Sequence, residues 1–154
     1  MTALRRIATI AFGVLATSAV AVSATSAGGR EGVKLPPFER VTLDNGVQLV
    51  LMPKRDTPMI AMTVLARGGS LADAPGREGT ASLLADLTQK GAGSRDAAQF
   101  AEAIEGAGGS LSVGAGSESL VASASFLARD TGLMIELVSD ALLRPRLDPG
   151  EFEK

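Results

Sequence analysis

The spacing of apolar and polar residues predicts three strands in the first part of the chain. Two β-prone runs, 38–43 and 47–52, flank Asp44-Asn45-Gly46, and Asn-Gly between such runs is a strong hairpin signal. A near-continuous apolar run at 59–67 predicts a third strand. A loop with Gly, Asp and Pro follows and reaches Glu78. Three strands are therefore expected before the first helix.

The spacing becomes helical from Gly79 to Lys90. We expect the apolar face of this helix to consist of Leu83, Leu84 and Leu87. The polar face carries Ser82, Asp86 and Gln89 at positions i, i+4 and i+7. Residues at such positions can converge on one ligand, so this face is the place where the spacing suggests a site.

One further helix and two strands are predicted for the middle of the chain. Ser94 is a good N-cap for a helix over 97–105. Its inward face is expected to consist of Phe100, Ala101 and Ile104. The runs 111–113 and 120–127 then predict two strands.

Two more helices are predicted for the last part of the chain. Asp130 can cap a helix over 131–143, and Pro145 ends it. In Asp148-Pro149-Gly150-Glu151 a capping residue precedes a Pro at the first helical position, so a fourth helix should begin there. The sequence stops a few residues later, which is typical of a truncated chain, because so short a helix has too few hydrogen bonds to stand alone.

This order of elements, with strands grouped before helices, predicts an α+β fold. We expect a largely antiparallel sheet with helices packed on one face. The recurrent Gly-Ala-Gly segments mark turns, and none of them completes a phosphate-binding loop.

The N-terminal residues have the layout of a secretory signal peptide. Arg5 and Arg6 precede a charge-free stretch of 16 residues, 7–22, and small residues follow up to Ala27. A stretch this short is a poor membrane span, which needs about 20 residues. We therefore expect a signal peptide at 1–27, a linker at 28–37 and one domain at 38–154, exported to the periplasm or secreted.

Composition excludes several kinds of chemistry. The chain has 154 residues with no His, Cys, Trp or Tyr, and its formal charge is −2. It can therefore supply neither an imidazole base nor a thiolate nucleophile. Scattered basic residues and missing stacking aromatics argue against nucleic acid as a partner.

The stretch from Leu43 to Lys154 resembles the N-terminal domain of the insulinase, pitrilysin and mitochondrial-processing-peptidase family of zinc peptidases, the inverzincins. The resemblance depends on motifs in the family's order and spacing. These are Leu43-Asp44-Asn45-Gly46, Arg67-Gly68-Gly69-Ser70, Glu78-Gly79-Thr80-Ala81, Lys90-Gly91, Ala103-Ile104-Glu105 with Gly108-Gly109, Leu142-Leu143-Arg144-Pro145, and 148–154.

The resemblance also implies which residues would hold zinc, and they are altered here. In active relatives the helix after the equivalent of Gly79 carries H-x-x-E-H, in which two histidines bind zinc and the glutamate activates water. Ser82 and Asp86 stand at the two histidine positions, and Ala85 stands at the glutamate. The family's third ligand, a glutamate, would fall beyond Lys154. We therefore expect no catalytic residue and no bound zinc or other cofactor in this chain.

Two other uses of this helix are weaker. Ser82 and Asp86 offer oxygen donors suited to Mg²⁺ or Ca²⁺, but two donors are far fewer than the six or more that calcium takes. A Ser82 nucleophile activated by Lys90 would need to act across about 12 Å of helical rise, so we discard it.

The resemblance implies an exported, catalytically silent homologue. Such a protein would pair with an active H-x-x-E-H subunit, helping to enclose and bind its peptide substrates. Two alternatives remain at this point. One is an independent structural or peptide-binding protein on the same fold. The other is an active metalloendopeptidase whose zinc site lies in a missing part of the chain.

Overall fold

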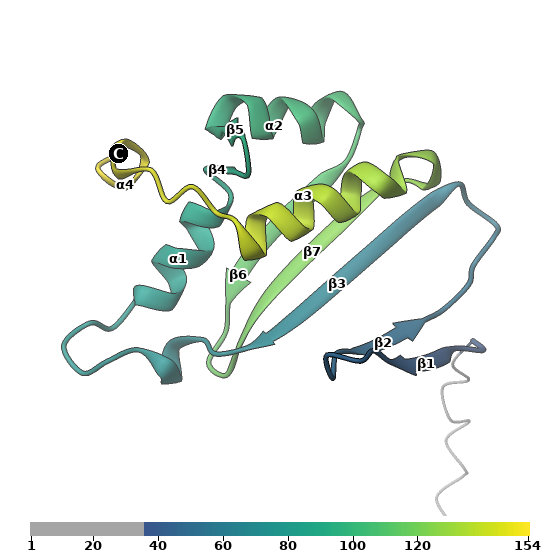
Figure 1. The fold of residues 1–154 in the computed structure, drawn as a ribbon, viewed down its shortest axis with the longest axis horizontal. Helices are drawn as coiled ribbons and strands as arrows, with labels where there is room; N and C mark the ends of the chain where they lie inside the picture. The colour runs from purple at the N-terminus through teal and green to yellow at the C-terminus, as the bar shows by residue number, and fades with distance from the viewer. Residues whose placement is uncertain (1–35) are drawn as a thin grey trace, which may run out of the picture. The chain divides into compact units, whose positions relative to one another are not determined.

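The computed structural model describes residues 36–154, so the expected signal peptide and nearly all of the expected linker lie outside the described residues. Its main sheet contains three antiparallel strands in the order β3-β7-β6 (Figure 1). These strands are β3, Met59–Arg67, β6, Ser110–Ala115, and β7, Ser119–Leu127. The central strand β7 pairs with β3 along its whole length.

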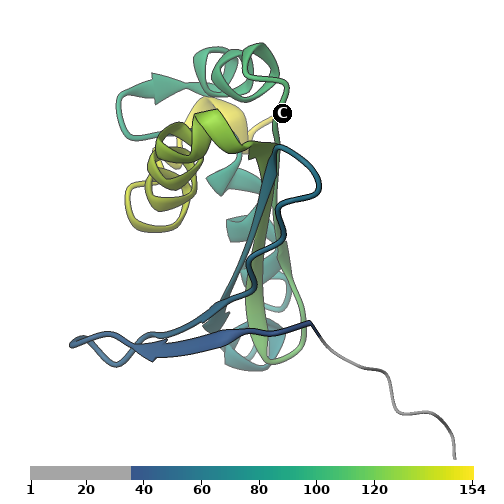
Figure 2. The same cartoon turned by 90° about the vertical axis from the view of Figure 1, so that its right-hand side faces the viewer.

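The helices pack against one face of this sheet. Three helices do so: α1, Thr80–Thr88, α2, Ala97–Gly106, and α3, Thr131–Leu143. Figure 2 shows the sheet nearly edge-on with α3 on one side of it. The largest fully buried side chains between the layers are Phe100, Phe126, Met134 and Leu137. The prediction of an α+β fold with a largely antiparallel sheet and helices on one face is confirmed.

The middle of the other face of the sheet has small side chains, whereas its ends carry the larger Met59, Leu65, Val121 and Leu127. Alternation along β7 places Ala122, Ala124 and Phe126 inward and the intervening residues on the opposite face. The register puts small polar or small apolar residues side by side across all three strands of that face, namely Ala61, Thr63, Ser110, Ser112, Ser123 and Ser125.

The predicted N-terminal hairpin is present as a separate two-stranded sheet. Its strands are β1, Glu39–Thr42, and β2, Gln48–Leu51, and they pair with each other. Every residue of both strands is exposed, including Val41, Leu49 and Val50. The rest of the described domain therefore buries little of this hairpin. A two-stranded hairpin without such burial is only marginally stable in water.

The helix α1 buries a different face from the one predicted. Leu83 is 40% exposed, and Leu84 and Leu87 are only half-buried. The buried residues are instead Ala81, Ala85 and Thr88. Small side chains let the helix backbone approach β6 and β7 closely, whereas leucines would hold it away.

The segment between α1 and α2 forms two very short strands that the sequence did not predict. They are β4, Gly91–Ala92, and β5, Arg95–Asp96. The N-cap of α2 is Asp96, which forms a capping box with Gln99, so the prediction of Ser94 as the cap was wrong. Ala101 is exposed, contrary to prediction, and Ala103 packs against the core in its place.

Short helical elements complete the described chain. They are η1, Ser70–Ala72, η2, Ala128–Asp130, and α4, Pro149–Phe152. The Asp148 side chain caps α4 as predicted, but the Asp130 side chain makes no capping hydrogen bond at α3. Within 36–154, none of the helices has the length and apolarity required to cross a membrane.

Candidate functional site

The polar face of α1 does not assemble the side chains that the sequence suggested could act together. Ser82 and Asp86 are exposed, one helical turn apart. Ala85, at the position of the family's catalytic glutamate, is 2% exposed and packs in a small apolar cluster with Val113 and Ala122. The methyl group of Ala85 therefore belongs to the helix–sheet interface, while its two neighbours on the motif face solvent.

A loop carboxylate occupies the N-terminus of α1. Asp73 accepts hydrogen bonds from the backbone N–H groups of Gly79 and Ala81, at 2.8 and 2.9 Å. These N–H groups lack partners within the helix, and a carboxylate there also complements the helix dipole. Beside it, the Gly76 N–H donates to Glu78 at 3.0 Å and holds the pKa of that carboxyl below its usual range. The loop before α1 is thus ordered by its own acidic residues.

Gln89 does not share a ligand site with Ser82 and Asp86. Its Nε2 donates to the Ala85 carbonyl at 3.1 Å and to the Val113 carbonyl at 3.0 Å. This side-chain amide therefore ties the end of α1 to strand β6.

The residues on α1 do not fit a zinc ion. Zinc in proteins is held by thiolate, imidazole and carboxylate groups, typically three or four of them. Of the three motif residues, Asp86 alone has such a group, because Ser82 offers a hydroxyl and Ala85 offers nothing. Across the part of the chain that the structure describes, no three Asp or Glu side chains gather closely enough to hold a metal ion.

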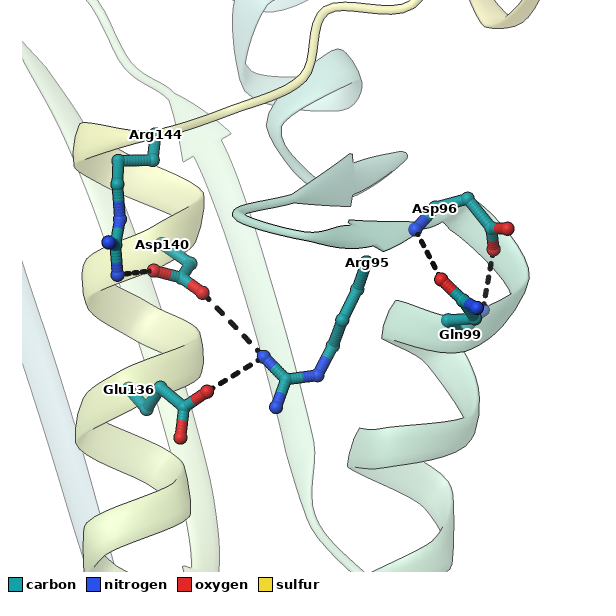
Figure 3. Close-up of polar contacts among 6 residues, drawn as sticks. All are labelled: Arg95, Asp96, Gln99, Glu136, Asp140 and Arg144. Carbon is teal, nitrogen blue, oxygen red and sulfur yellow. Dashed lines mark hydrogen bonds and ion pairs between the residues drawn. The ribbon is translucent and has the colours of Figure 1, made fainter.

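A second charged cluster lies between α3 and the β4–β5 hairpin (Figure 3). Asp140 is 3% exposed, and one of its carboxylate oxygens accepts a hydrogen bond from Arg144. The other oxygen lies 3.6 Å from Arg95, which also pairs with Glu136 at 2.9 Å. Both oxygens of the buried carboxylate are therefore engaged by arginines.

Backbone contacts reinforce this cluster. The Gly93 N–H donates to the Arg144 carbonyl at 2.9 Å, and the Arg146 N–H donates to the Gly91 carbonyl at 3.0 Å. An open hollow of about 500 Å³ adjoins the cluster. Because Asp140 is satisfied by protein groups, the arrangement is a structural tie between α3 and the hairpin.

Sequence reasoning missed the residues that organise this region. Asp73 gave no signal, and the i,i+4 pair of Asp140 and Arg144 was not used, although only the contact of Asp140 with Arg95 required the fold. Gln89 was predicted to lie on a polar face with Ser82 and Asp86, but it is half-buried and bonds to Val113, which lies 24 residues away.

Comparisons with known proteins agree with this fold. The family described as Insulinase (Peptidase family M16) matches residues 49–154. No curated protein matches the chain significantly. A protease from Helicobacter pylori has a similar structure at 27% identity, with a TM-score of 0.68, and the match covers 77% of this chain and 29% of that one.

A second solved structure is similar at lower identity. The peptidase M16 inactive domain from Pseudomonas fluorescens is 20% identical, with a TM-score of 0.65, and the match covers 74% of this chain and 28% of that one. The match thus spans less than a third of either solved chain. Because the family match extends over more than half of the sequence, from β2 to the last residue, the chain belongs to the insulinase family, peptidase family M16.

Proposed function

We propose that this protein is an exported, catalytically silent member of the family. In this role it partners an active H-x-x-E-H subunit and helps to enclose and bind that subunit's peptide substrates. One observation carries the proposal: the three motif positions on α1 hold Ser82, Ala85 and Asp86, and the position of the water-activating base is a buried methyl group. General-base catalysis contributes about two to four powers of ten in rate, so its loss alone removes useful activity.

The sheet gives the protein a way to bind peptides without cleaving them. Extended peptides can join the edge strand of an exposed sheet, with main-chain hydrogen bonds supplying affinity. The β3-β7-β6 sheet ends in two edges, β3 and β6, and β6 lies beside α1. One solved relative is described as an inactive domain, which supports the view that this fold occurs without activity.

Zinc content and peptidase activity of the purified full-length protein test catalytic silence. We expect substoichiometric zinc by atomic absorption and no cleavage of an unstructured fluorogenic peptide. Stoichiometric zinc, together with cleavage that a chelator abolishes, would contradict the proposal and favour an active enzyme with a site elsewhere in the protein.

Reconstitution tests the partner role. A family member with an intact H-x-x-E-H motif from the same organism is assayed with and without this protein. We expect co-elution as one complex and an increase of tenfold or more in kcat/KM for a long peptide. The matched control is a partner in which the motif glutamate is replaced by glutamine, which should still co-elute but cleave nothing. A protein that remains a monomer and leaves kcat/KM unchanged would favour the independent binding protein.

Export is tested by the N-terminus of the mature protein. We expect N-terminal sequencing of the periplasmic or secreted material to begin near Gly28. Recovery of the intact chain from the cytoplasm would contradict this part of the proposal.

A further inference from the structure

The hydrogen-bond ladder of the sheet fixes which backbone groups of β6 face outward. Gly116 N–H donates to the Ser119 carbonyl at 2.8 Å, at the end of the β6–β7 pairing. Because antiparallel pairing alternates, Ser112 and Gly114 also direct their backbone groups toward β7. The N–H and C=O groups of the alternate residues, Leu111, Val113 and Ala115, therefore lie along the outer edge.

One of these edge groups already has a partner. The Gln89 Nε2 donates to the Val113 carbonyl at 3.0 Å, and its second hydrogen is directed to the Ala85 carbonyl at 3.1 Å. The amide thus takes the place that a backbone N–H of an added strand would occupy. Among the described residues, no hydrogen bond of this kind is made to Leu111 or Ala115.

We propose that Gln89 is a latch on the β6 edge, which an extended peptide must displace before it can pair along the whole strand. This inference rests on the proposed function, because it assumes that peptides bind by joining the sheet. The latch leaves the backbone groups of Leu111 open, so a peptide pairs there first. It pairs with Val113 only after the Gln89 hydrogen bond to that residue has broken. A peptide that reaches Val113 must replace the Gln89 hydrogen bond, whereas a peptide that pairs at Leu111 alone need not.

The structure provides room for the displaced side chain. A cavity of about 320 Å³ lies between α2 and β6, and it is lined by Gln89 together with Phe100, Ile104 and Leu111, among others. A glutamine amide that turns toward this space leaves α1 in place. The Gln89 side chain is half-buried, so its release does not require the core to open.

The test compares peptide binding by the full-length protein and its Gln89→Leu variant, which lacks the amide donors. The probe is a fluorescein-labelled ten-residue peptide of alternating Val and Thr with a terminal Lys at each end, measured by fluorescence anisotropy. A second probe carries two adjacent N-methyl groups at its centre, which removes one donor from each edge. Gln48→Leu, on the exposed strand β2, is the matched control.

Gln89→Leu should bind the unmethylated peptide roughly fivefold more tightly than wild type, the equivalent of one hydrogen bond that no longer competes. It should gain nothing for the methylated peptide, and Gln48→Leu should match wild type. If Gln89→Leu does not fold, as judged by circular dichroism, Gln89→Met removes the same donors with an unbranched chain.

Two results would overturn the latch. In the first, the Gln89 variant binds the unmethylated peptide no more tightly than wild type, while methylation still weakens peptide binding. That result would support strand addition but would show that Gln89 does not oppose it. Binding that is absent, or unaffected by methylation, in every variant would remove strand addition itself and with it the latch.

Discussion

At the N-terminus of α1 a side chain from the preceding loop does the work of a helix cap. Asp73 accepts from two N–H groups of that helix, while Gly79 at the N-cap position has no side chain to offer. The first turn of α1 therefore depends on a residue outside the helix.

Replacing Asp73 by Ala should lower the free energy of unfolding by about 1–2 kcal/mol, because two N–H groups lose their partner. Urea denaturation measures this, with Asp44→Ala in the hairpin turn as the control. A change no larger than that of the control would mean that water replaces the carboxylate without cost.

The lowered pKa of Glu78 predicts a pH dependence. Its carboxylate accepts from the Gly76 N–H, which lowers its pKa below the ordinary value for a glutamate in the folded chain. A group with a lowered folded pKa stabilises the fold above its unfolded pKa, and this contribution is lost as the pH falls through the folded value. Carbon-detected NMR titration should therefore give Glu78 a lower midpoint in the folded chain than in urea. Equal midpoints would contradict the hydrogen bond.

At the scale of single elements, two residues near the start of α2 were candidates for its N-cap. Asp96 forms the capping box, and Ser94 is exposed with no capping hydrogen bond. Asp96→Ala should lower the free energy of unfolding by about 1 kcal/mol, while Ser94→Ala should change it by less than about 0.5 kcal/mol. The reverse order in thermal denaturation would restore Ser94 as the cap.

The tie between the β4–β5 hairpin and α3 depends on a glycine. Gly93 has φ +59, and a Cβ at this position would lie 2.3 Å from an Asp140 carboxylate oxygen. Gly93→Ala should therefore destabilise the protein by about 1–3 kcal/mol, through backbone strain and displacement of the carboxylate.

A double-mutant cycle separates these two causes. With Asp140→Ala in place, the added Cβ no longer meets a carboxylate, so Gly93→Ala should cost about 0.5–1.5 kcal/mol less than it does alone. Additive effects in chemical denaturation would leave backbone strain as the whole cause.

Element boundaries followed closely from the sequence where apolar spacing was long and uninterrupted. The strand at 59–67 and the helix at 131–143 have the predicted bounds. The buried face of α1 was not predictable in the same way, because hydrophobicity favours Leu83 whereas close approach to the sheet requires Ala81 and Ala85. The choice of Asp96 over Ser94 was available from the sequence, because Asp96 with Gln99 three residues later is a capping-box pattern.

The sequence predicted which residues occupy the candidate site, but not which residues surround them. The residues at the three motif positions follow from the sequence alone, as does their lack of imidazole. That Ala85 packs against Val113, and that Gln89 bonds to the same strand, required the fold, since these partners are far apart in the chain.

At the scale of the whole molecule, the described domain represents a small part of the solved family members that it resembles, under a third of each. The apolar side chains of β1 and β2 are exposed, because no other part of residues 36–154 covers them. The tests of the proposed activity and partnership therefore use the full-length protein.

Restoration of the metal motif tests how far α1 has diverged. Ser82→His with Asp86→His should fold normally and take up zinc weakly, because both positions are exposed one turn apart. Adding Ala85→Glu should lower the free energy of unfolding by about 1–3 kcal/mol, because a larger, charged group enters an apolar interface.

Calorimetric zinc titration and urea denaturation measure these effects, with wild type as the zinc-free control. Failure of the two-histidine variant to take up any zinc would mean that the helix surface itself no longer suits a metal. An undiminished stability of the triple variant would mean that the interface can accommodate the carboxylate.

The burial of Ala85 bears on the evolutionary history of this helix. A lineage that regained histidines at the two surface positions would meet no obstacle from packing, whereas regaining the acid between them would pass through a less stable ancestor unless Val113 or Ala122 changed as well. Under the proposed function, acquiring a base at 85 is therefore harder than acquiring metal ligands at 82 and 86, and descendants of this protein should vary at 82 and 86 while 85 stays small.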